Sequence, residues 1–428
     1  MTGHTRRAVL GLLGCAALAG CSALSSDPVS ERTELDGAAL RGAVTGERID
    51  GVGNPVEIGA DYRHSIRGRA EDDLESVPDP LTAEDIPNAE VRDELGGFRE
   101  RARNALDAAE EAAGAGDALN HLRDARKDAA AIAAGWAFTR GAFGPDDLAD
   151  RRAALGEDAA AFAETWSYEG DDPVCATAVH AAIESRYRQA TGEAAATFDR
   201  EARVVPLAEA ARETAGGRTA LATARHLNER YRASLSDPTD YRATIEAAGD
   251  ALAARIRERR RSLPEARDPD ELVSDLEPRG IGWYAIENAA RGAEERLGDA
   301  SGPATRLSNA VGTLANIAAF ESVLETLRSE PAAFDVTSAE QVAERRSAAL
   351  TAIERARESE RTALARRPLE AALGSVRYAD RAIGRAADAE SVAVERITLE
   401  VSYYVQAAAI ARAAPDAAAR AAAALADG

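Results

Sequence analysis

The sequence predicts an all-α protein, built as one or more elongated bundles of long antiparallel helices that follow a flexible N-terminal tether. Apolar residues recur at spacings of three and four over residues 241–256 and 307–327, which is the pattern of a helix with one buried face. About a quarter of the residues are alanine, and faces lined by alanine allow helices to pack closely. The helices are expected to run for roughly 20–28 residues, which makes rods of roughly 30–40 Å.

The first twenty residues have the order of a secretory signal peptide. Arg6 and Arg7 precede an apolar run from Ala8 to Leu18, and small residues follow. The apolar run is about 11 residues long, well short of the roughly 20 that a helix needs to cross a bilayer. We therefore expect residues 1–20 to be a cleaved signal peptide and not a permanent membrane span.

Two short motifs make this assignment more specific. The pair Arg6 and Arg7 resembles a twin-arginine export signal, although Gly11 stands where such signals often have a lysine. A second motif resembles a lipobox, at which a lipid is attached to a cysteine thiol and the chain is cleaved just before it: Leu18, Ala19, Gly20 and Cys21. The resemblance implies a mature protein held through Cys21 at the outer face of the cytoplasmic membrane.

The chain is strongly acidic, with a formal net charge of −21. Residues 1–20 contain two arginines and no acid, so their removal lowers the net charge to −23. Such a protein is expected to repel nucleic acid and anionic lipid headgroups. Lys127 is the single lysine, and every other cationic side chain of fixed charge is an arginine. Together with the signal, this composition resembles exported lipoproteins of extremely halophilic archaea, a resemblance limited to the signal and the composition.

The mature chain divides into a tether and two helical parts. Residues 21–60 are rich in serine and glycine without sustained periodicity, which predicts a tether with room for a short ordered piece. A helical bundle is expected over 61–263 and another over 283–428, or both as one continuous domain. Residues 264–282, marked by prolines and glycines, form the predicted connector.

Several residues mark the expected helix starts. Ser338 to Gln341 form a capping box, in which side chains bind the free amides of the first turn. Proline is favoured in a first turn because its missing N–H has no partner there. Four prolines occupy such positions: Pro145, Pro173, Pro238 and Pro303.

Residues 397–405 fit two patterns. Apolar residues alternate with polar ones, as in a strand, but Val394, Ile397, Val401 and Tyr404 also follow helical spacing. A lone strand would leave its backbone groups unpaired, so a helix is favoured. That helix would be apolar nearly all round and hence central in its bundle.

Common catalytic motifs are missing from the sequence. It contains no P-loop, no dinucleotide-binding glycine motif, no Gly-x-Ser-x-Gly elbow and no Cys-x-x-Cys pair. We therefore predict no enzyme and name no cofactor. Cys175 is the one thiol left after processing, either as a small buried residue or as a thiolate stabilised at a helix start.

Three histidines are candidate metal ligands. His121, His180 and His226 lie on separate predicted helices, and each has an acid one turn further on: Asp124, Glu184 and Glu229. Side chains one turn apart share a helix face, so three helices could bring nitrogen and oxygen ligands together in a bundle core. Because the chain has 73 acidic residues, such pairs are also expected by chance.

Two functions remain open at this point. The first is a membrane-anchored extracytoplasmic protein that acts by binding or scaffolding, with another envelope protein or a small solute as its partner. The alternative is a metal-binding or enzymatic helical bundle that uses the three histidines. Convergence of these histidines in the fold would favour the metal-binding or enzymatic bundle, and scattered histidines would favour the binding or scaffolding protein.

Overall fold

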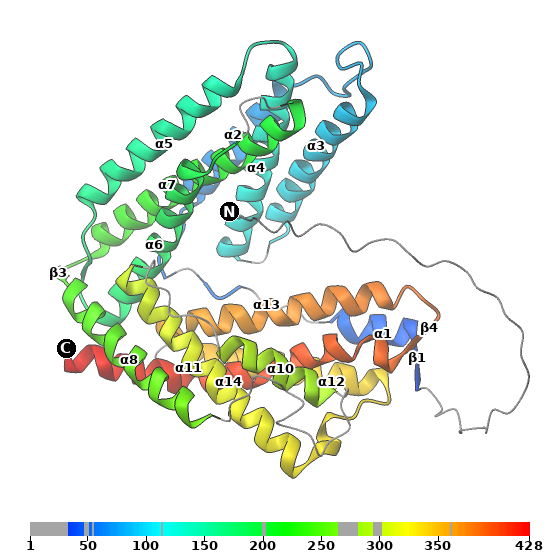
Figure 1. The fold of residues 1–428 in the computed structure, drawn as a ribbon, viewed down its shortest axis with the longest axis vertical. Coiled ribbons are helices and arrows are strands. Elements are labelled where there is room, and N and C mark those ends of the chain that lie inside the picture. The colour runs from blue at the N-terminus through cyan, green and yellow to red at the C-terminus, as the bar shows by residue number, and fades with distance from the viewer. Residues whose placement is uncertain are drawn as a thin grey trace, which may run out of the picture.

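The computed structural model describes residues 33–46, 51–53, 55–112, 114–198, 203–263, 281–293, 302–359 and 362–428. Within these ranges the chain is overwhelmingly helical and forms two bundles (Figure 1), which confirms the predicted all-α class. The signal and lipobox predictions fall on residues 1–21, which lie outside the described ranges. In the described part of the chain, no helix is both long and apolar enough to cross a membrane.

The first bundle is built around one long helix, α7. It contains α2 (Ala60–Glu75), α3 (Ala89–Glu110), α4 (Ala115–Thr139), α5 (Pro145–Thr165), α6 (Pro173–Ala195) and α7 (Val204–Ser234). Helix α7 packs against α4, α5 and α6. A Cβ atom at Gly217 would lie 2.8 Å from the Cβ of Glu193 and 2.9 Å from Leu155, so glycine allows this close approach of three helices.

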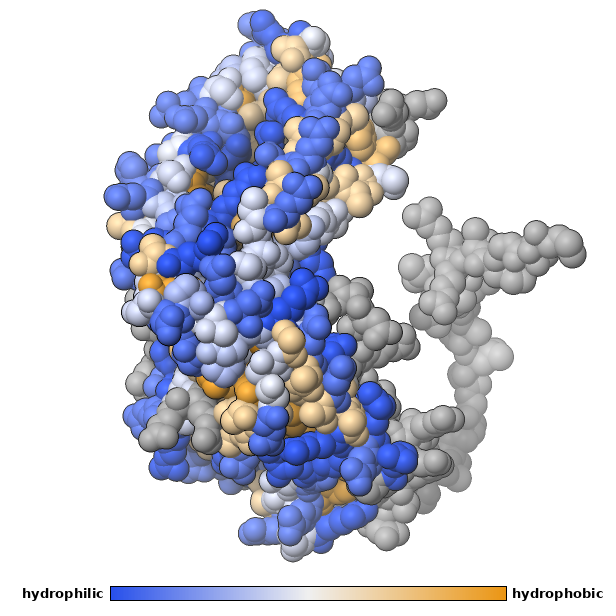
Figure 2. Space-filling view, turned by 90° about the vertical axis from the view of Figure 1, so that its left-hand side faces the viewer, coloured by the Kyte–Doolittle hydropathy of each residue, from blue (hydrophilic) through white to orange (hydrophobic). Residues whose placement is uncertain are grey.

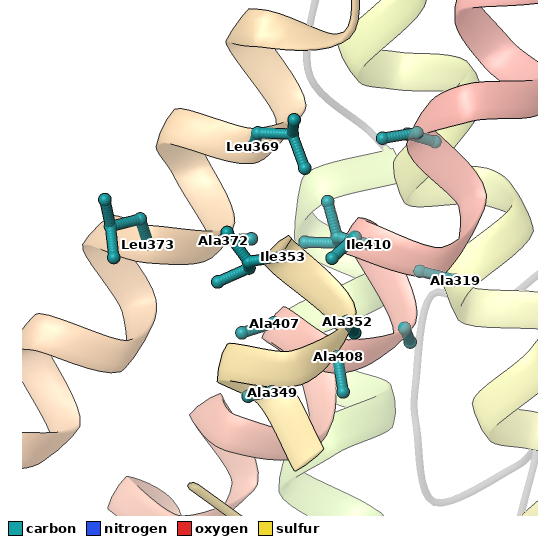
Figure 3. Packing of buried hydrophobic residues seen from close by; sticks show 14 of the residues in the cluster. Ala319, Ala349, Ala352, Ile353, Leu369, Ala372, Leu373, Ala407, Ala408 and Ile410 are labelled. Carbon is teal, nitrogen blue, oxygen red and sulfur yellow. The ribbon is translucent and has the colours of Figure 1, made fainter. Parts of the chain in front are cut away.

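The second bundle is built around the C-terminal helix. Its described helices are α8 (Arg242–Ser262), α10 (Ile281–Ala293), α11 (Pro303–Ser329), α12 (Ala339–Arg357), α13 (Thr362–Ala386) and α14 (Thr398–Asp427), with the short helices η1 (Pro331–Phe334) and η2 (Val394–Arg396). Helix α14 packs against α8, α10, α11, α12 and α13. Small side chains such as Ala349, Ala372 and Ala407 fill the space between three of these helices (Figure 3). The prediction of a central helix over residues 397–405 is therefore confirmed from residue 398 onward.

Part of the predicted tether belongs to the fold. Strand β1 (Glu34–Asp36) pairs antiparallel with β4 (Ser391–Ala393). Helix α1 (Gly37–Val44) then packs on α12 and α13, and the Asp36 side chain caps its first turn by accepting a hydrogen bond from the Ala39 amide. The tether boundary at residue 60 is thus too late, because residues 34–44 are packed against the second bundle.

Helix α8 also corrects a predicted boundary. Its buried residues Ile245, Leu252 and Ile256 belong to the same apolar core as Leu307 and Tyr404, so α8 is part of the second bundle and not of a first bundle ending at 263. Most of the predicted connector, residues 264–280, lies outside the described ranges, and α10 already begins at Ile281.

The predicted helix starts can be compared with the structure. Pro145, Pro173 and Pro303 each begin a helix, as expected, and the side chain of Ser338 caps α12. Pro238 does not begin a helix. It precedes the short strand β3 (Thr239–Asp240), which pairs with β2 (Glu169–Gly170), and α8 starts only after that strand.

The two bundles meet along α6. This helix packs against α5 and α7 in its own bundle and against α11 and α13 in the other. Figure 1 shows α13 along the edge of the second bundle that faces the first. The region between α6, α11 and α13 is therefore formed jointly by both bundles.

Candidate functional site

His180 lies in a buried aromatic cluster and has both ring nitrogens engaged. Its Nδ1 accepts a hydrogen bond from Nε1 of Trp166 (3.1 Å), and its Nε2 lies 2.9 Å from the Glu169 carbonyl, to which it donates. The ring packs at an angle against Tyr168 and edge-on against Tyr231. Burial lowers the pKa of His180, so the neutral ring is favoured. No nitrogen of this ring is left for a metal.

Glu184, one turn after His180, joins the two bundles. Its carboxylate accepts hydrogen bonds from the Tyr168 hydroxyl (2.7 Å) and from the backbone amides of Ala304 (3.0 Å) and Thr305 (2.6 Å) at the start of α11. A Cβ atom at Gly302 would lie 2.4 Å from this carboxyl group, so a larger residue would have to displace it. A side chain of the first bundle thus caps a helix of the second, where a negative charge is favoured by the helix dipole.

His226 is separated from His180 by its own contacts. Its ring stacks on Tyr62, with centroids 4.2 Å apart and planes at 8°. The Tyr62 hydroxyl in turn lies 2.8 Å from the hydroxyl of Thr223. Burial, with a smaller effect from Arg230, lowers the pKa of His226. Glu229, its predicted partner, is exposed.

His121 lies in a third place, and the three histidines do not converge. It lines a cavity of about 780 Å³ between α4 and α13, while Asp124 is exposed. Among the described residues, no group of three or more histidines, cysteines and acids is placed to hold a metal ion. The metal-site prediction for His121, His180, His226, Asp124, Glu184 and Glu229 is therefore wrong, because the helices that carry these side chains hold them in separate places.

A cavity of about 410 Å³ lies between the bundles and is lined by charged side chains from both. Its walls come from residues 51–52, from α4, α6 and α7, and from α11 and α13 of the second bundle. Among the described residues that line it, two are acids, Asp117 and Glu370. Five are arginines: Arg186, Arg188, Arg366, Arg367 and Arg377. The wall thus carries a formal charge opposite to that of the whole chain.

Both carboxylates of the wall are engaged. Asp117 accepts from Arg377 across the bundle interface (2.8 and 3.3 Å) and from the Gly51 amide (3.1 Å). Although burial raises it, the pKa of Asp117 is held below its usual range by Arg377. Glu370 accepts from Nε of Arg366 one helical turn away (2.8 Å). The pair of Asp117 and Arg377 also lines the larger cavity beside His121, so it stands between the two cavities.

Two polar groups in the smaller cavity differ from the others. Arg186 of α6 has no hydrogen bond or ion pair within the described part of the chain. Burial, together with the nearby charges of Arg123 and Arg366, lowers the pKa of Arg186 to about 10, although the carboxylate of Glu370 acts in the opposite direction. The hydroxyl of Thr305, a residue only 3% exposed, has no partner among the described atoms either. Buried polar groups without partners are rare in folded proteins and call for an explanation.

Two family models match the chain, one over most of the first bundle and one over most of the second. Residues 61–237 match a domain of unknown function, DUF8262. Residues 242–423 match a second domain of unknown function, DUF8264. No curated protein and no solved structure matches the chain.

The family boundaries agree with the packing of α8. The DUF8262 region ends before β3, and the DUF8264 region begins with the first residue of α8, well before the predicted connector at 264–282. Helices α4, α6 and α7 fall in the DUF8262 region, whereas α11 and α13 fall in the DUF8264 region. The arginine-lined cavity therefore lies where the two matched regions of the chain meet.

The arginines of this cavity are not marked as a site by any pattern in the sequence. Arg186 and Arg366 are far apart in the chain, and only the packing of α6 beside α13 brings them to one cavity. The one local signal is that arginines occur in close pairs, at 186 and 188 and at 366 and 367, within an acidic chain. Such pairs also occur elsewhere in the sequence, so they do not identify a site by themselves.

Cys175 has neither of the two predicted roles. It is exposed at the start of α6, so it is not a buried core residue. Partial desolvation of the thiol and its hydrogen bond to Asp172 raise the pKa of Cys175 to about 11. The thiol is therefore protonated at neutral pH and is not an activated nucleophile.

Proposed function

We propose that this protein is a lipid-anchored extracytoplasmic binding protein that holds a small solute between its two bundles. The observation that carries the proposal is the cavity of about 410 Å³ whose walls come from both bundles. Its volume falls in the range of small-molecule sites, which are commonly found between domains. Polar groups from α6, α11 and α13 converge on it, as expected of a site that orients a ligand.

The location rests on the N-terminal sequence. Arg6 and Arg7, the apolar run and the lipobox ending at Cys21 together support export and attachment of a lipid. An anchored protein with a ligand cavity would hold its solute at the outer face of the cytoplasmic membrane. The acidic charge of the chain argues against nucleic acid as a partner.

A variant that fills the cavity tests solute binding. Ala182 of α6 lines the cavity, so Ala182→Phe should occupy the space that the solute needs. The full chain would be purified in detergent and denatured, and the released small molecules would be identified by mass spectrometry. Wild type should release a solute that the variant has largely lost.

The matched control is Ala423→Phe, at an exposed position on α14. It makes the same change of side chain away from the cavity and should retain the solute. Circular dichroism confirms that both variants remain helical. Equal amounts of every solute in wild type and Ala182→Phe would contradict the proposed function.

A single substitution tests the anchor. Because the thiol of Cys21 is the proposed attachment point, Cys21→Ser should prevent lipid attachment and move the protein from the detergent phase to the aqueous phase in a phase-partition assay. Cys15→Ser, which changes a cysteine within the apolar run, is the control and should partition like wild type. Retention of Cys21→Ser in the detergent phase would show that the anchor is elsewhere.

A further inference from the structure

The charge of the cavity wall points to the class of ligand. The chain as a whole carries −21, yet the described residues that line the cavity include five arginines against two carboxylates. In a protein with 73 acidic residues, acids are the readily available partners for arginines. A place where arginines outnumber acids is therefore a local reversal of the charge of the whole molecule.

One arginine of the wall, Arg186, stands apart from the ion pairs of the others. Arg377 is paired with Asp117, and Arg366 is paired with Glu370. Arg186 has no hydrogen bond or ion pair of this kind among the described residues. It is partly buried, and the charges of Arg123 and Arg366 near it outweigh that of the Glu370 carboxylate, which is already engaged by Arg366. Desolvating a guanidinium beside other cations is unfavourable unless an anion compensates for it.

The Thr305 hydroxyl offers a second donor from the other bundle. It is buried on α11, lines the same cavity and has no hydrogen-bond partner in the described structure. The backbone amide of the same residue is already satisfied by Glu184, so the unpaired group is the side chain alone. Arg186 of the first bundle and Thr305 of the second thus both line one cavity, and neither the guanidinium nor the hydroxyl has a hydrogen-bond partner among the described residues.

We propose that the cavity binds a small oxyanion of the phosphate class, held by Arg186 and the Thr305 hydroxyl. The inference rests on the proposed function and names the chemistry of the solute. An arginine fork matches two oxygens of a tetrahedral oxyanion, and a hydroxyl donates to a third. A halide ion has no separate oxygens for the two N–H groups of the fork and for the hydroxyl, so the site should prefer phosphate to chloride.

Isothermal titration of the full chain in detergent with inorganic phosphate tests the proposal. The KCl concentration is kept at about 2 M, so that non-specific attraction to arginines is screened and chloride is in excess. Wild type should bind one phosphate per chain. Arg186→Gln should weaken binding by at least about tenfold, as expected for the loss of hydrogen bonds to a charged group.

The control is Arg420→Gln at an exposed position on α14, which removes the same charge outside the cavity. It should bind phosphate as wild type does. Thr305→Val, which keeps the shape of the side chain without its hydroxyl, should also weaken binding. Equal affinity in wild type and Arg186→Gln would overturn the inference, as would a complete absence of phosphate binding to wild type.

The outcome can be separated from that of the proposed function. If wild type retains an uncharged solute that Ala182→Phe loses, and phosphate does not bind, the cavity is a solute site and the oxyanion inference is wrong. If no solute depends on the cavity and phosphate does not bind, both proposals fail. Phosphate binding that is lost in both Arg186→Gln and Ala182→Phe supports both.

Discussion

The carboxylate of Glu184 accepts three hydrogen bonds, from Tyr168 in its own bundle and from two backbone amides of α11 in the other. Its side chain is buried, with 5% of the residue exposed. Burial and the adjacent carboxylate raise the pKa of Tyr168, so its hydroxyl remains a donor over the whole physiological range. The charge of Glu184 thus stabilises contacts on both sides of the interface.

Glu184→Gln should therefore destabilise the protein. The amide group has one acceptor oxygen, so its NH₂ would face an N–H donor of α11 and leave both unpaired. The expected loss is about 2 kcal/mol, which lowers the melting temperature by several degrees, roughly 4–8 °C. Thermal denaturation followed by circular dichroism measures the change.

Glu229→Gln is the matched control, because Glu229 is exposed on α7. It should leave the melting temperature within about 1 °C of wild type, as is usual for surface substitutions. An unchanged melting temperature for Glu184→Gln would mean that the carboxylate does not stabilise the junction between the bundles.

The same residues show which part of the site the sequence can and cannot reveal. Helical spacing correctly places His180 and Glu184 on one face of α6, as the metal hypothesis required. It does not reveal that Trp166 and a backbone carbonyl form hydrogen bonds with the two ring nitrogens of His180. Nor does it reveal that the carboxylate of Glu184 accepts from a backbone amide 120 residues further along the chain. Partners at such separations depend on how the helices pack, and no local pattern encodes them.

At the level of helices and strands, the strength of the local signal decides what can be predicted. The stripe over residues 241–256 predicts a helix whose apolar face is buried, and Ile245, Leu252 and Ile256 are fully buried in α8. An apolar stripe indicates that one face of a helix is buried, but it does not indicate which neighbouring helix covers that face. The prediction therefore assigned α8 to the wrong bundle. The proline and glycine cluster after α8 marks a local break in helical structure, which is not the boundary between the domains.

Short strands give the weakest signal. Strand β1 has three residues, too few to display a period of two, and Ser391 of its partner β4 is 357 residues away from Glu34. Its formation depends on pairing across the chain and not on its own composition. The ordered part of the predicted tether was therefore not placed by sequence reasoning.

At the scale of the whole molecule, the dominant property is negative charge. Figure 2 shows a surface on which hydrophilic residues prevail over small apolar areas. At low ionic strength the repulsion among acidic groups reaches far, with a Debye length of about 30 Å at 0.01 M salt but only about 3 Å at 1 M. The cores contain many alanines, which bury little apolar area each to offset this repulsion.

Stability should therefore depend on salt. We expect the melting temperature of the full chain in detergent to rise from dilute buffer to multimolar KCl, with the steepest change below about 0.1 M, where screening varies most. Ellipticity measured during heating across a KCl series checks this. A melting temperature that is constant or falls as salt increases would contradict a halophilic adaptation of the surface.

The pairing of β1 with β4 has a consequence for how the protein stands on a membrane. If Cys21 carries the lipid, about 13 residues separate the anchor from Glu34, and an extended chain of that length spans at most about 45 Å. This reach limits how far the second bundle can lie from the bilayer surface, because β1 and α1 pack on that bundle. The first bundle follows α1 in the chain and is positioned by its contacts with the second. The packing of α6 on α11 and α13 would then carry this limit from the second bundle to the first.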